Sequence, residues 1–162
     1  MALCLEHGLR NVTIEKIAKA AGVSKQTVYK HWEHKGFIVL DGVTEVVLAR
    51  PRPAPEPGDD ALTYVLKFFI QIQNSHLGIL LRQVIGEAQT DPSLHQAVLE
   101  RMSNPARRVA AEHLGEEMPD KFHYDIALGL IWYRYLVLQE PTDAALAEQL
   151  AKSIQILQKT PV

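Results

Sequence analysis

The sequence predicts an all-α protein in two parts, and three observations lead to this prediction. Apolar residues recur at spacings of three and four along nearly the whole chain, and the alternation typical of strands is missing. A Gly-Val-Ser turn at residues 22–24 joins two short helical segments. The segment PRPAPEPG, residues 51–58, has a proline at every second position and cannot continue a helix. We therefore expect an N-terminal helical domain at residues 1–50, an extended connector at 51–58 and a C-terminal helical domain at 59–162.

Composition narrows the class of protein. The 162 residues are 47% hydrophobic and 22% charged, as is usual for a globular domain. The single cysteine, Cys4, cannot form an internal disulfide, which favours a reducing compartment. The most apolar run, residues 126–138, is interrupted by Arg134 and is too short to cross a bilayer. We expect a cytoplasmic protein with no membrane partner.

Charge is distributed unevenly, although the net charge is only −2. Residues 10–35 contain six basic and two acidic residues, whereas residues 51–162 contain 10 basic and 14 acidic residues. A basic patch on an otherwise acidic chain is typical of a DNA-binding module attached to another function. A solvated helix face gives the same pattern, so charge alone leaves both interpretations open.

The first two helices of the N-terminal domain are expected at residues 2–7 and 14–21. Gly8 is suited to end the first helix, because glycine readily adopts the left-handed conformation found after a helix. Thr13 is suited to cap the second, because its hydroxyl can accept a hydrogen bond from a first-turn amide. Four small or branched apolar side chains form one face of this second helix. They are Ile14, Ile17, Ala18 and Ala21.

The next two helices follow the Gly-Val-Ser turn. Gly22 permits a left-handed conformation, and Ser24 caps a short helix in which Val28 faces inward. The fourth helix covers residues 35–49. Two helices joined by a tight glycine turn, the second with a polar N-terminal end, are typical of a helix-turn-helix.

The polar first turn of the helix after Ser24 is suited to reading bases in the major groove of DNA. The side chain of Lys25 can donate to guanine, and that of Gln26 can pair with an adenine edge. Thr27 can hydrogen-bond to a base or contact a thymine methyl group. These three residue types therefore predict direct readout of double-stranded DNA.

Other residues of the helix-turn-helix are placed for phosphate contacts, which position a protein on DNA without reading its sequence. Tyr29, His31 and Lys35 lie where such contacts are common, and the helix-start amides at Thr13 and Ser24 can add to them. The complete set of predicted DNA-binding residues is Thr13, Ser24, Lys25, Gln26, Thr27, Tyr29, Lys30, His31 and Lys35.

Residues 12–39, VTIEKIAKAAGVSKQTVYKHWEHKGFIV, resemble the DNA-binding domain of the tetracycline-repressor-type (TetR) family of bacterial transcriptional regulators. The matching residues are Gly8, Thr13, Ile17, Ala18, Ala21, Gly22, Val23, Ser24, Thr27, Tyr29, His31, Trp32 and Lys35. The resemblance implies an all-helical homodimer that binds a pseudo-palindromic DNA operator and takes a small-molecule effector in its C-terminal domain. Against the family pattern the first helix is truncated, and Trp32 stands where Phe is usual.

Helical spacing continues in the C-terminal domain. It predicts helices at residues 59–74, 77–89, 92–114, 121–139 and 143–158. Asp91 and Pro92 have the residue types of an N-cap and a first helical position. Pro105 is expected to kink or divide the helix that they begin, because proline removes a backbone donor and clashes with the preceding turn.

The last two helices carry apolar stripes that allow two interpretations. One stripe consists of Leu146, Leu150, Ile154 and Leu157, and the helix before it carries Ile126, Leu130, Trp132, Tyr133 and Leu136. Both stripes are either part of the core of one chain or, as the resemblance implies, a four-helix interface between two copies.

The effector pocket, also implied by the resemblance, should lie inside the C-terminal helices. Its candidate residues are Phe69, Gln73, His76, Leu80, Val84, Met102 and Trp132. For each of them simple core packing is an open alternative. An aromatic and methionine lining would suit an apolar or aromatic effector.

Catalytic and metal-binding patterns are weak. The chain has no G-x-S-x-G motif and no Gly-rich phosphate loop. His31 and His34 have a spacing that occurs in metal sites, but cysteines are missing nearby and Glu33 lies between them. We therefore expect no enzyme activity, no cofactor and no metal.

The expected function is that of a ligand-responsive DNA-binding transcriptional regulator, a repressor released from its operator by a small-molecule effector. The alternative is a helical small-molecule-binding dimer that has lost DNA binding. An activator or an enzyme fits the sequence less well. Salt-dependent binding to DNA would separate the first two, because phosphate contacts release counterions.

Overall fold

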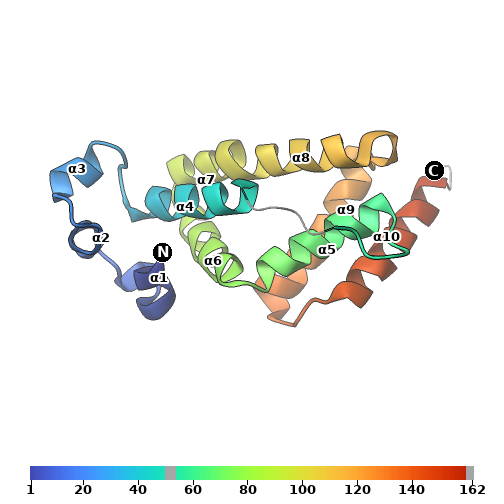
Figure 1. Ribbon diagram of the computed structural model, residues 1–162, viewed down its shortest axis with the longest axis horizontal. Coiled ribbons are helices and arrows are strands. Elements are labelled where there is room, and N and C mark those ends of the chain that lie inside the picture. The colour runs from blue at the N-terminus through green and yellow to red at the C-terminus, as the bar shows by residue number, and fades with distance from the viewer. Residues whose placement is uncertain (50–53, 160–162) are drawn as a thin grey trace. The chain divides into compact units, whose positions relative to one another are not determined.

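The computed structural model describes residues 1–49 and 54–159, and within these ranges it contains helices and loops and no strand (Figure 1). The prediction of an all-α fold is confirmed. Contacts divide the chain into two compact units. The N-terminal unit contains Met1–Arg50 and His76–Ala106, and the C-terminal unit contains Pro51–Ser75 and Arg107–Val162. Over the described ranges no helix combines the length and apolar character that crossing a bilayer requires.

The N-terminal unit begins with the helices that the sequence predicts. They are α1 (Ala2–His7), α2 (Ile14–Ala21), α3 (Lys25–Tyr29) and α4 (Lys35–Ala49), with a short 3₁₀ turn, η1 (Leu9–Asn11), between the first two. Gly8 ends α1 with φ of 76°, a value that favours glycine. The predicted helices are therefore confirmed. Gly8 ends α1 as expected, but with ψ of 145° it lies outside the left-handed helical conformation.

Three further segments complete this unit, namely α6 (His76–Ala88), α7 (Pro92–Val98) and the π-helical segment η2 (Leu99–Ser103). Helix α4 contacts both α6 and α7, and α6 also contacts α1 and η1 (Figure 1). Apolar side chains from α4 and α6 are fully buried; they include Leu40, Val43, Leu80 and Val84. This burial explains why residues 76–106 pack with the N-terminal helices, although the sequence division assigns them to the second domain.

Pro105 lies at the second position of α8 (Asn104–Leu114), directly after η2. The helical run from Pro92 to Leu114 is thus divided by a π-helical segment, as the proline predicts. A π turn places an extra residue in the helix ahead of the proline, which accommodates its ring and its missing donor. At the other end Asp91 caps α7, because its Oδ1 accepts hydrogen bonds from the amides of Ser93 and Leu94, both at 3.0 Å.

The C-terminal unit is built from α5 (Ala61–Gln73), α9 (Lys121–Tyr133) with its π-helical end η4 (Arg134–Leu138), α10 (Ala144–Lys159) and the 3₁₀ turn η3 (Gly115–Glu117). Helix α10 contacts both α5 and α9. Buried members of its core include Leu62, Leu66, Ile70, Leu114, Tyr124, Ile131, Leu150 and Ile154. The side chains of Leu150 and Ile154 thus belong to the core of the chain itself, which decides between the two interpretations of that stripe for these two residues.

Only part of the proline-rich connector is described, because residues 51–53 lie outside the described residues. Residues 54–58 are exposed. The connector is held to α5 by the ammonium group of Lys67, which lies 2.9 Å from Glu56, 2.8 Å from Asp59 and, on α10, 3.2 Å from Glu148. Three carboxylates raise the pKa of Lys67, since each stabilises its charged form.

Candidate nucleic-acid interface

Helices α2 and α3 form the helix-turn-helix, and the local hydrogen bonds agree with the predicted caps. The hydroxyl of Thr13 accepts from the amide of Lys16 at 3.3 Å, and that of Ser24 accepts from the amide of Thr27 at 3.2 Å. Gly22 has φ of 69°, in the left-handed region that glycine adopts without strain. Both capping residues and the turn glycine are therefore confirmed as local structure.

A small hydrophobic core packs against the buried side of α3. It consists of buried Ile14, Ala18 and Val28, with Trp32 and Ile38 packed against it. The indole nitrogen of Trp32 donates a hydrogen bond to Asp41 on α4 at 2.9 Å, which ties the end of the motif to the next helix. Ala21 differs from the apolar face expected for α2, because it is exposed. The side chain of Val23, in the turn between α2 and α3, is 42% exposed.

The predicted base-reading residues all lie on the solvent-exposed side of α3. Lys25, Gln26 and Thr27 are exposed, whereas Val28 between them and the next turn is 4% exposed. The ammonium group of Lys25 lies 3.9 Å from Glu15, at a distance that a DNA contact can readily break. A hydrogen bond from its own backbone amide lowers the pKa of Glu15, together with a hydrogen bond to Thr13 and the charge of Lys25. The first turn of α3 thus presents three hydrogen-bonding side chains on a packed support.

Three other predicted DNA-binding residues lie beside this turn. Tyr29 is 52% exposed, and Lys30 and His31 are also exposed. The ring of His31 packs against that of Trp32, with centroids 5.6 Å apart. Packing against the indole restricts the imidazole, so it can present a ring nitrogen to a phosphate at little cost in conformational entropy.

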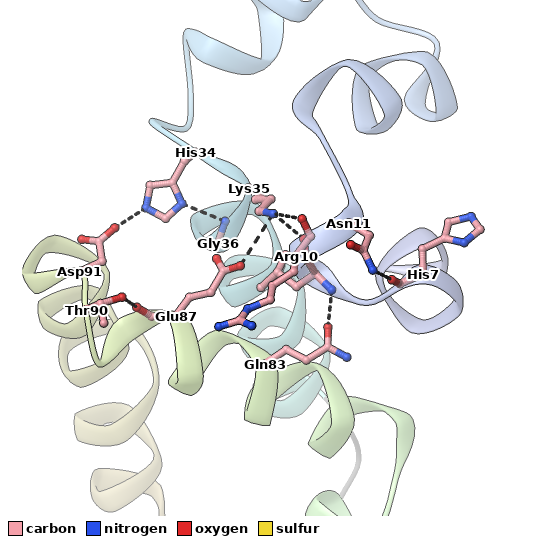
Figure 2. Close-up of polar contacts among 11 residues, drawn as sticks. His7, Arg10, Asn11, His34, Lys35, Gly36, Gln83, Glu87, Thr90 and Asp91 are labelled. Carbon is pink, nitrogen blue, oxygen red and sulfur yellow. Dashed lines mark hydrogen bonds and ion pairs between the residues drawn. The ribbon is translucent and has the colours of Figure 1, made fainter.

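Lys35 is placed differently from the other predicted DNA-binding residues (Figure 2). Its Nζ donates to the backbone carbonyl oxygens of Leu9 at 2.6 Å and Arg10 at 3.0 Å. It also lies 3.8 Å from the carboxylate of Glu87 on α6, and its side chain is 22% exposed. The ammonium group is therefore occupied inside the N-terminal unit, and a structural role explains its position better than a phosphate contact.

His34, the residue before α4, forms a second polar contact, with Asp91 at the start of α7 (Figure 2). Its Nδ1 accepts from the amide of Gly36 at 3.1 Å, so the neutral ring carries its proton on Nε2, which lies 2.8 Å from Asp91. Amides of α7, Ser93 and His34 together lower the pKa of Asp91 to about 2. Both nitrogens of His34 thus have partners within the chain, and among the described residues no group of three or more potential metal ligands occurs.

The residues that anchor this motif from α6 and α7 were missed by sequence reasoning. The Oε1 of Gln83 accepts from the amide of Leu9 at 2.7 Å, and Glu87 and Asp91 contact Lys35 and His34. These partners are separated by 52 to 74 positions in the sequence. Polar side chains on an otherwise amphipathic helix give no pattern that identifies such a distant partner.

The seven candidate effector residues divide between the two units. His76, Leu80, Val84 and Met102 belong to the N-terminal unit, and Phe69, Gln73 and Trp132 belong to the C-terminal unit. Leu80 and Val84 are fully buried, and His76 is exposed. A cavity of about 370 Å³ in the C-terminal unit is lined by other residues, among them Tyr64, Phe68, Ile70, Asn74 and Thr142.

Gln73 differs from the other candidates in its hydrogen bonding. It is 4% exposed, and among the described residues no group hydrogen-bonds to its Oε1. A buried carbonyl oxygen without a donor costs about 1–3 kcal/mol relative to one that is satisfied. Simple core packing therefore does not explain the choice of glutamine at this position.

Helix α9 and its end η4 carry a stripe of exposed apolar side chains. These are Phe122 at 69% exposure, Ile126 at 37%, Leu130 at 40%, Tyr133 at 50% and Val137 at 63%. Their spacings of three and four residues place them on one face of the helix. A continuous apolar face left in water is typical of a protein–protein interface.

Comparisons with known proteins agree with the helix-turn-helix and with the C-terminal helices. Residues 1–40 match the model of the bacterial regulatory proteins of the tetR family, and residues 58–154 match that of the tetracyclin repressor-like C-terminal domain. The chain belongs to the TetR family of helix-turn-helix transcriptional regulators, and the resemblance seen in the sequence is confirmed.

Several relatives cover most of the chain. The HTH-type transcriptional regulator YdeS of Bacillus subtilis (strain 168) is 30% identical over 83% of this chain and 73% of its own. The regulator Mb1581 of Mycobacterium bovis is 24% identical over 87% of this chain and 74% of its own. The crystal structure of the TetR family transcription regulator SCO0332 superposes with a TM-score of 0.72 at 31% identity, covering 99% of this chain and 93% of that one.

Proposed function

We propose that this TetR-family regulator binds operator DNA with α3 in the major groove and represses transcription until a small-molecule effector releases it. The observation that carries the proposal is the first turn of α3. Lys25, Gln26 and Thr27 are exposed there, while Val28 is buried in the core beneath them. Side chains with defined donors and acceptors on a rigid helix are suited to base edges in the major groove. Tyr29 and the other exposed residues at the end of α3 are proposed to bind phosphates.

A homodimer is part of this proposal, because a pseudo-palindromic operator needs two reading heads related by two-fold symmetry. The exposed stripe from Phe122 to Val137 supports α9 as the contact between two copies. An interface with two-fold symmetry brings the same patch of both partners together, and one apolar stripe on each copy meets this requirement. We assign the contact to this stripe in place of Leu150 and Ile154, which the chain buries in its own core.

The proposed effector acts by shifting a conformational equilibrium. Gln73 is the candidate contact with the best physical support, because its buried Oε1 needs a donor that an N–H or O–H group of an effector can provide. Coupling of about 1–3 kcal/mol between effector and DNA would weaken operator binding roughly 5- to 150-fold.

Contacts of α4 support a route for that coupling within the N-terminal unit. Helix α4 packs against α6, and Lys35 and Gln83 connect α4 and α6 to the backbone of η1. A shift of α6 relative to α4 therefore acts on the helix-turn-helix through packed side chains and hydrogen bonds. The cytoplasm, where the DNA is, is the compartment that this function requires.

Footprinting on the DNA directly upstream of the gene tests the proposal. We expect two protected half-sites whose centres are about one helical turn, or a multiple of it, apart, as two α3 helices in successive major grooves require. Affinity should fall steeply with salt, because phosphate contacts release counterions. Protein that stays folded and dimeric but protects no sequence, at low or moderate salt, would show that DNA is not its partner.

A further inference from the structure

The carboxylate of Asp41, on α4, accepts hydrogen bonds from two segments that are far apart in the sequence. Its Oδ2 accepts from the indole nitrogen of Trp32 at 2.9 Å, and its Oδ1 accepts from the guanidinium group of Arg101, on η2, also at 2.9 Å. All three residues belong to the N-terminal unit. One carboxylate therefore joins the end of the helix-turn-helix to the π-helical segment that precedes α8.

Trp32 is fixed to α3 by its backbone as well as by its ring. Its amide donates to the carbonyl oxygen of Val28 on α3 at 3.0 Å, and its side chain packs against the core that contains Val28. Close packing of this kind passes a displacement of the indole on to α3. Phenylalanine, which the family usually has at this position, lacks an N–H donor. The hydrogen bond to Asp41 is therefore not one that the family resemblance implies.

Arg101 is held at the other end of this connection by two contacts with α4. Besides its hydrogen bond to Asp41, its guanidinium group lies over the buried ring of Phe37, 5.3 Å from the ring centroid. A guanidinium group that is both hydrogen-bonded and placed over a ring has few alternative positions. The side chains of Arg101 and Asp41 are 45% and 38% exposed, so their ion pair contributes little to stability. Its effect is on the direction of the Asp41 carboxylate.

The position of Arg101 in the chain gives this contact a further consequence. Arg101 lies within η2, which directly precedes α8, and the residues of α8 from Arg107 onward belong to the C-terminal unit. Single π-helical turns are frequent at functional sites, and helices bend readily at them. A change in the bend at η2 therefore moves Arg101 and, through it, the carboxylate of Asp41.

We propose that Asp41 is a positioning residue for DNA reading, through which η2 sets the orientation of α3. One oxygen of its carboxylate is held by Arg101, and the other holds Trp32 and with it α3. This inference rests on the proposed function, because it assigns α3 to the major groove. The route is distinct from the contacts of Lys35 and Gln83 with η1, since neither side chain takes part in it.

Binding of the full-length protein to the protected upstream DNA and to random DNA, at several fixed salt concentrations, tests this proposal. Arg101→Gln and Trp32→Phe should each lower the ratio of specific to random affinity about 3- to 10-fold, which is the loss of one hydrogen bond. The double variant should lose no more than the larger single variant, because both changes interrupt the same connection.

Arg107→Gln is the matched control for Arg101→Gln. The guanidinium group of Arg107 also lies near a carboxylate, that of Asp125 at 3.9 Å, and over an aromatic ring, that of Tyr124 at 4.8 Å from the centroid. These contacts lie within the C-terminal unit and do not involve Asp41. The ratio of specific to random affinity in this variant should therefore equal that of the wild type.

The indole N–H signal of Trp32 in a nitrogen–proton NMR spectrum tests the connection without DNA. The chain has two tryptophans, so Trp132→Phe assigns the two indole signals. Arg101→Gln should shift the signal of Trp32 and speed its exchange with solvent, because the acceptor carboxylate is then less firmly held. The signal of Trp132 should not change.

Three results would overturn the proposal. The first is an unchanged Trp32 signal in Arg101→Gln, and the second is an additive loss of specificity in the double variant. The third is equal weakening on specific and random DNA by Arg101→Gln with a shallower salt dependence, which would make Arg101 a phosphate contact. If the wild type binds no DNA, the proposed function fails, and the Trp32 signal alone decides whether η2 is connected to α3. Circular dichroism checks folding; if Trp32→Phe unfolds, Arg101→Gln at its exposed position decides the outcome.

Discussion

The ammonium group of Lys35 lies 2.6 Å from the backbone carbonyl oxygen of Leu9, and this contact joins the first residue of α4 to the 3₁₀ turn η1. Leu9 is 1% exposed, and its own amide donates to Gln83 on α6. One short segment of backbone is thus held from two helices by charged and polar side chains. The N-terminal part of the chain that carries the helix-turn-helix is therefore attached to α6 through this segment as well as through α4.

The first prediction concerns Lys35. Lys35→Met keeps most of the aliphatic stem but removes the donors to Leu9 and Arg10. Hydrogen bonds from a charged group contribute about 1.5–3 kcal/mol, so the free energy of unfolding should fall by about this amount. Urea denaturation measures the change.

Lys30→Met is the control for this variant, because Lys30 is exposed on the same motif. Its stability should stay within about 0.5 kcal/mol of the wild type, while its affinity for all DNA sequences falls and the salt dependence becomes shallower by about one charge. If Lys35→Met behaves in the same way as Lys30→Met, then Lys35 is a phosphate contact and the structural role is wrong.

Local features of this fold follow from short sequence patterns. The caps at Thr13, Ser24 and Asp91 and the turn at Gly22 depend on residues within a few positions, and each appears where its residue type predicts it. Helix spans were predictable for the same reason. The π-helical segment before Pro105 was predictable as an interruption but not as that particular geometry.

Contacts between distant segments were not predictable from the sequence. The partners of Lys35 include a backbone carbonyl, which carries no sequence signal, and Glu87, one of many acidic residues on helix surfaces. The stripes at the C-terminus show the same limit. Leu150 and Tyr133 have similar apolar character, yet one is 6% exposed and the other 50% exposed. Periodicity identifies a face of a helix, and the packing of the other helices decides whether that face is covered.

A second prediction compares two helical glycines. A Cβ on Gly36 would lie 2.8 Å from both the ring of His34 and a methyl group of Leu94, so Gly36→Ala should destabilise the protein by about 1–3 kcal/mol through overpacking. Gly86→Ala meets open space and should stabilise it by up to about 1 kcal/mol, which is the helix preference of alanine. Thermal unfolding measures both changes. Equal stabilisation of the two variants would contradict the close packing at Gly36.

The third prediction concerns pH. The pKa of Asp91 is lowered to about 2, chiefly by amides at the start of α7, from an ordinary value near 3.8. A lowered carboxylate pKa stabilises the folded state above the ordinary value, and this contribution is lost as pH falls from about 4 through about 2. Asp91→Asn keeps a capping side chain but removes the charge. The stability difference between wild type and variant should therefore shrink over that interval; a difference that stays constant from pH 7 to pH 2 would contradict it.

The fourth prediction concerns the proposed dimer. Tyr133→Asp or Val137→Glu places a charge on the exposed stripe of α9 and should give a folded monomer, measured by light scattering and circular dichroism. Ile154→Glu places a charge at a side chain that is 1% exposed in the core and should unfold the C-terminal unit instead. If the wild-type chain is monomeric at micromolar concentration, this result would contradict the binding of one operator by two helix-turn-helix motifs.

Base reading by Gln26 is the central claim, and a competition titration tests it most directly. Wild type and Gln26→Ala are titrated with the protected upstream DNA and with random DNA at several fixed salt concentrations. Because Gln26 is exposed and supports no packing, stability should not change. We predict a loss of about 1–3 kcal/mol on the specific site, relaxed preference at one base pair and unchanged binding to random DNA. An equal loss on specific and random DNA would contradict direct readout by α3.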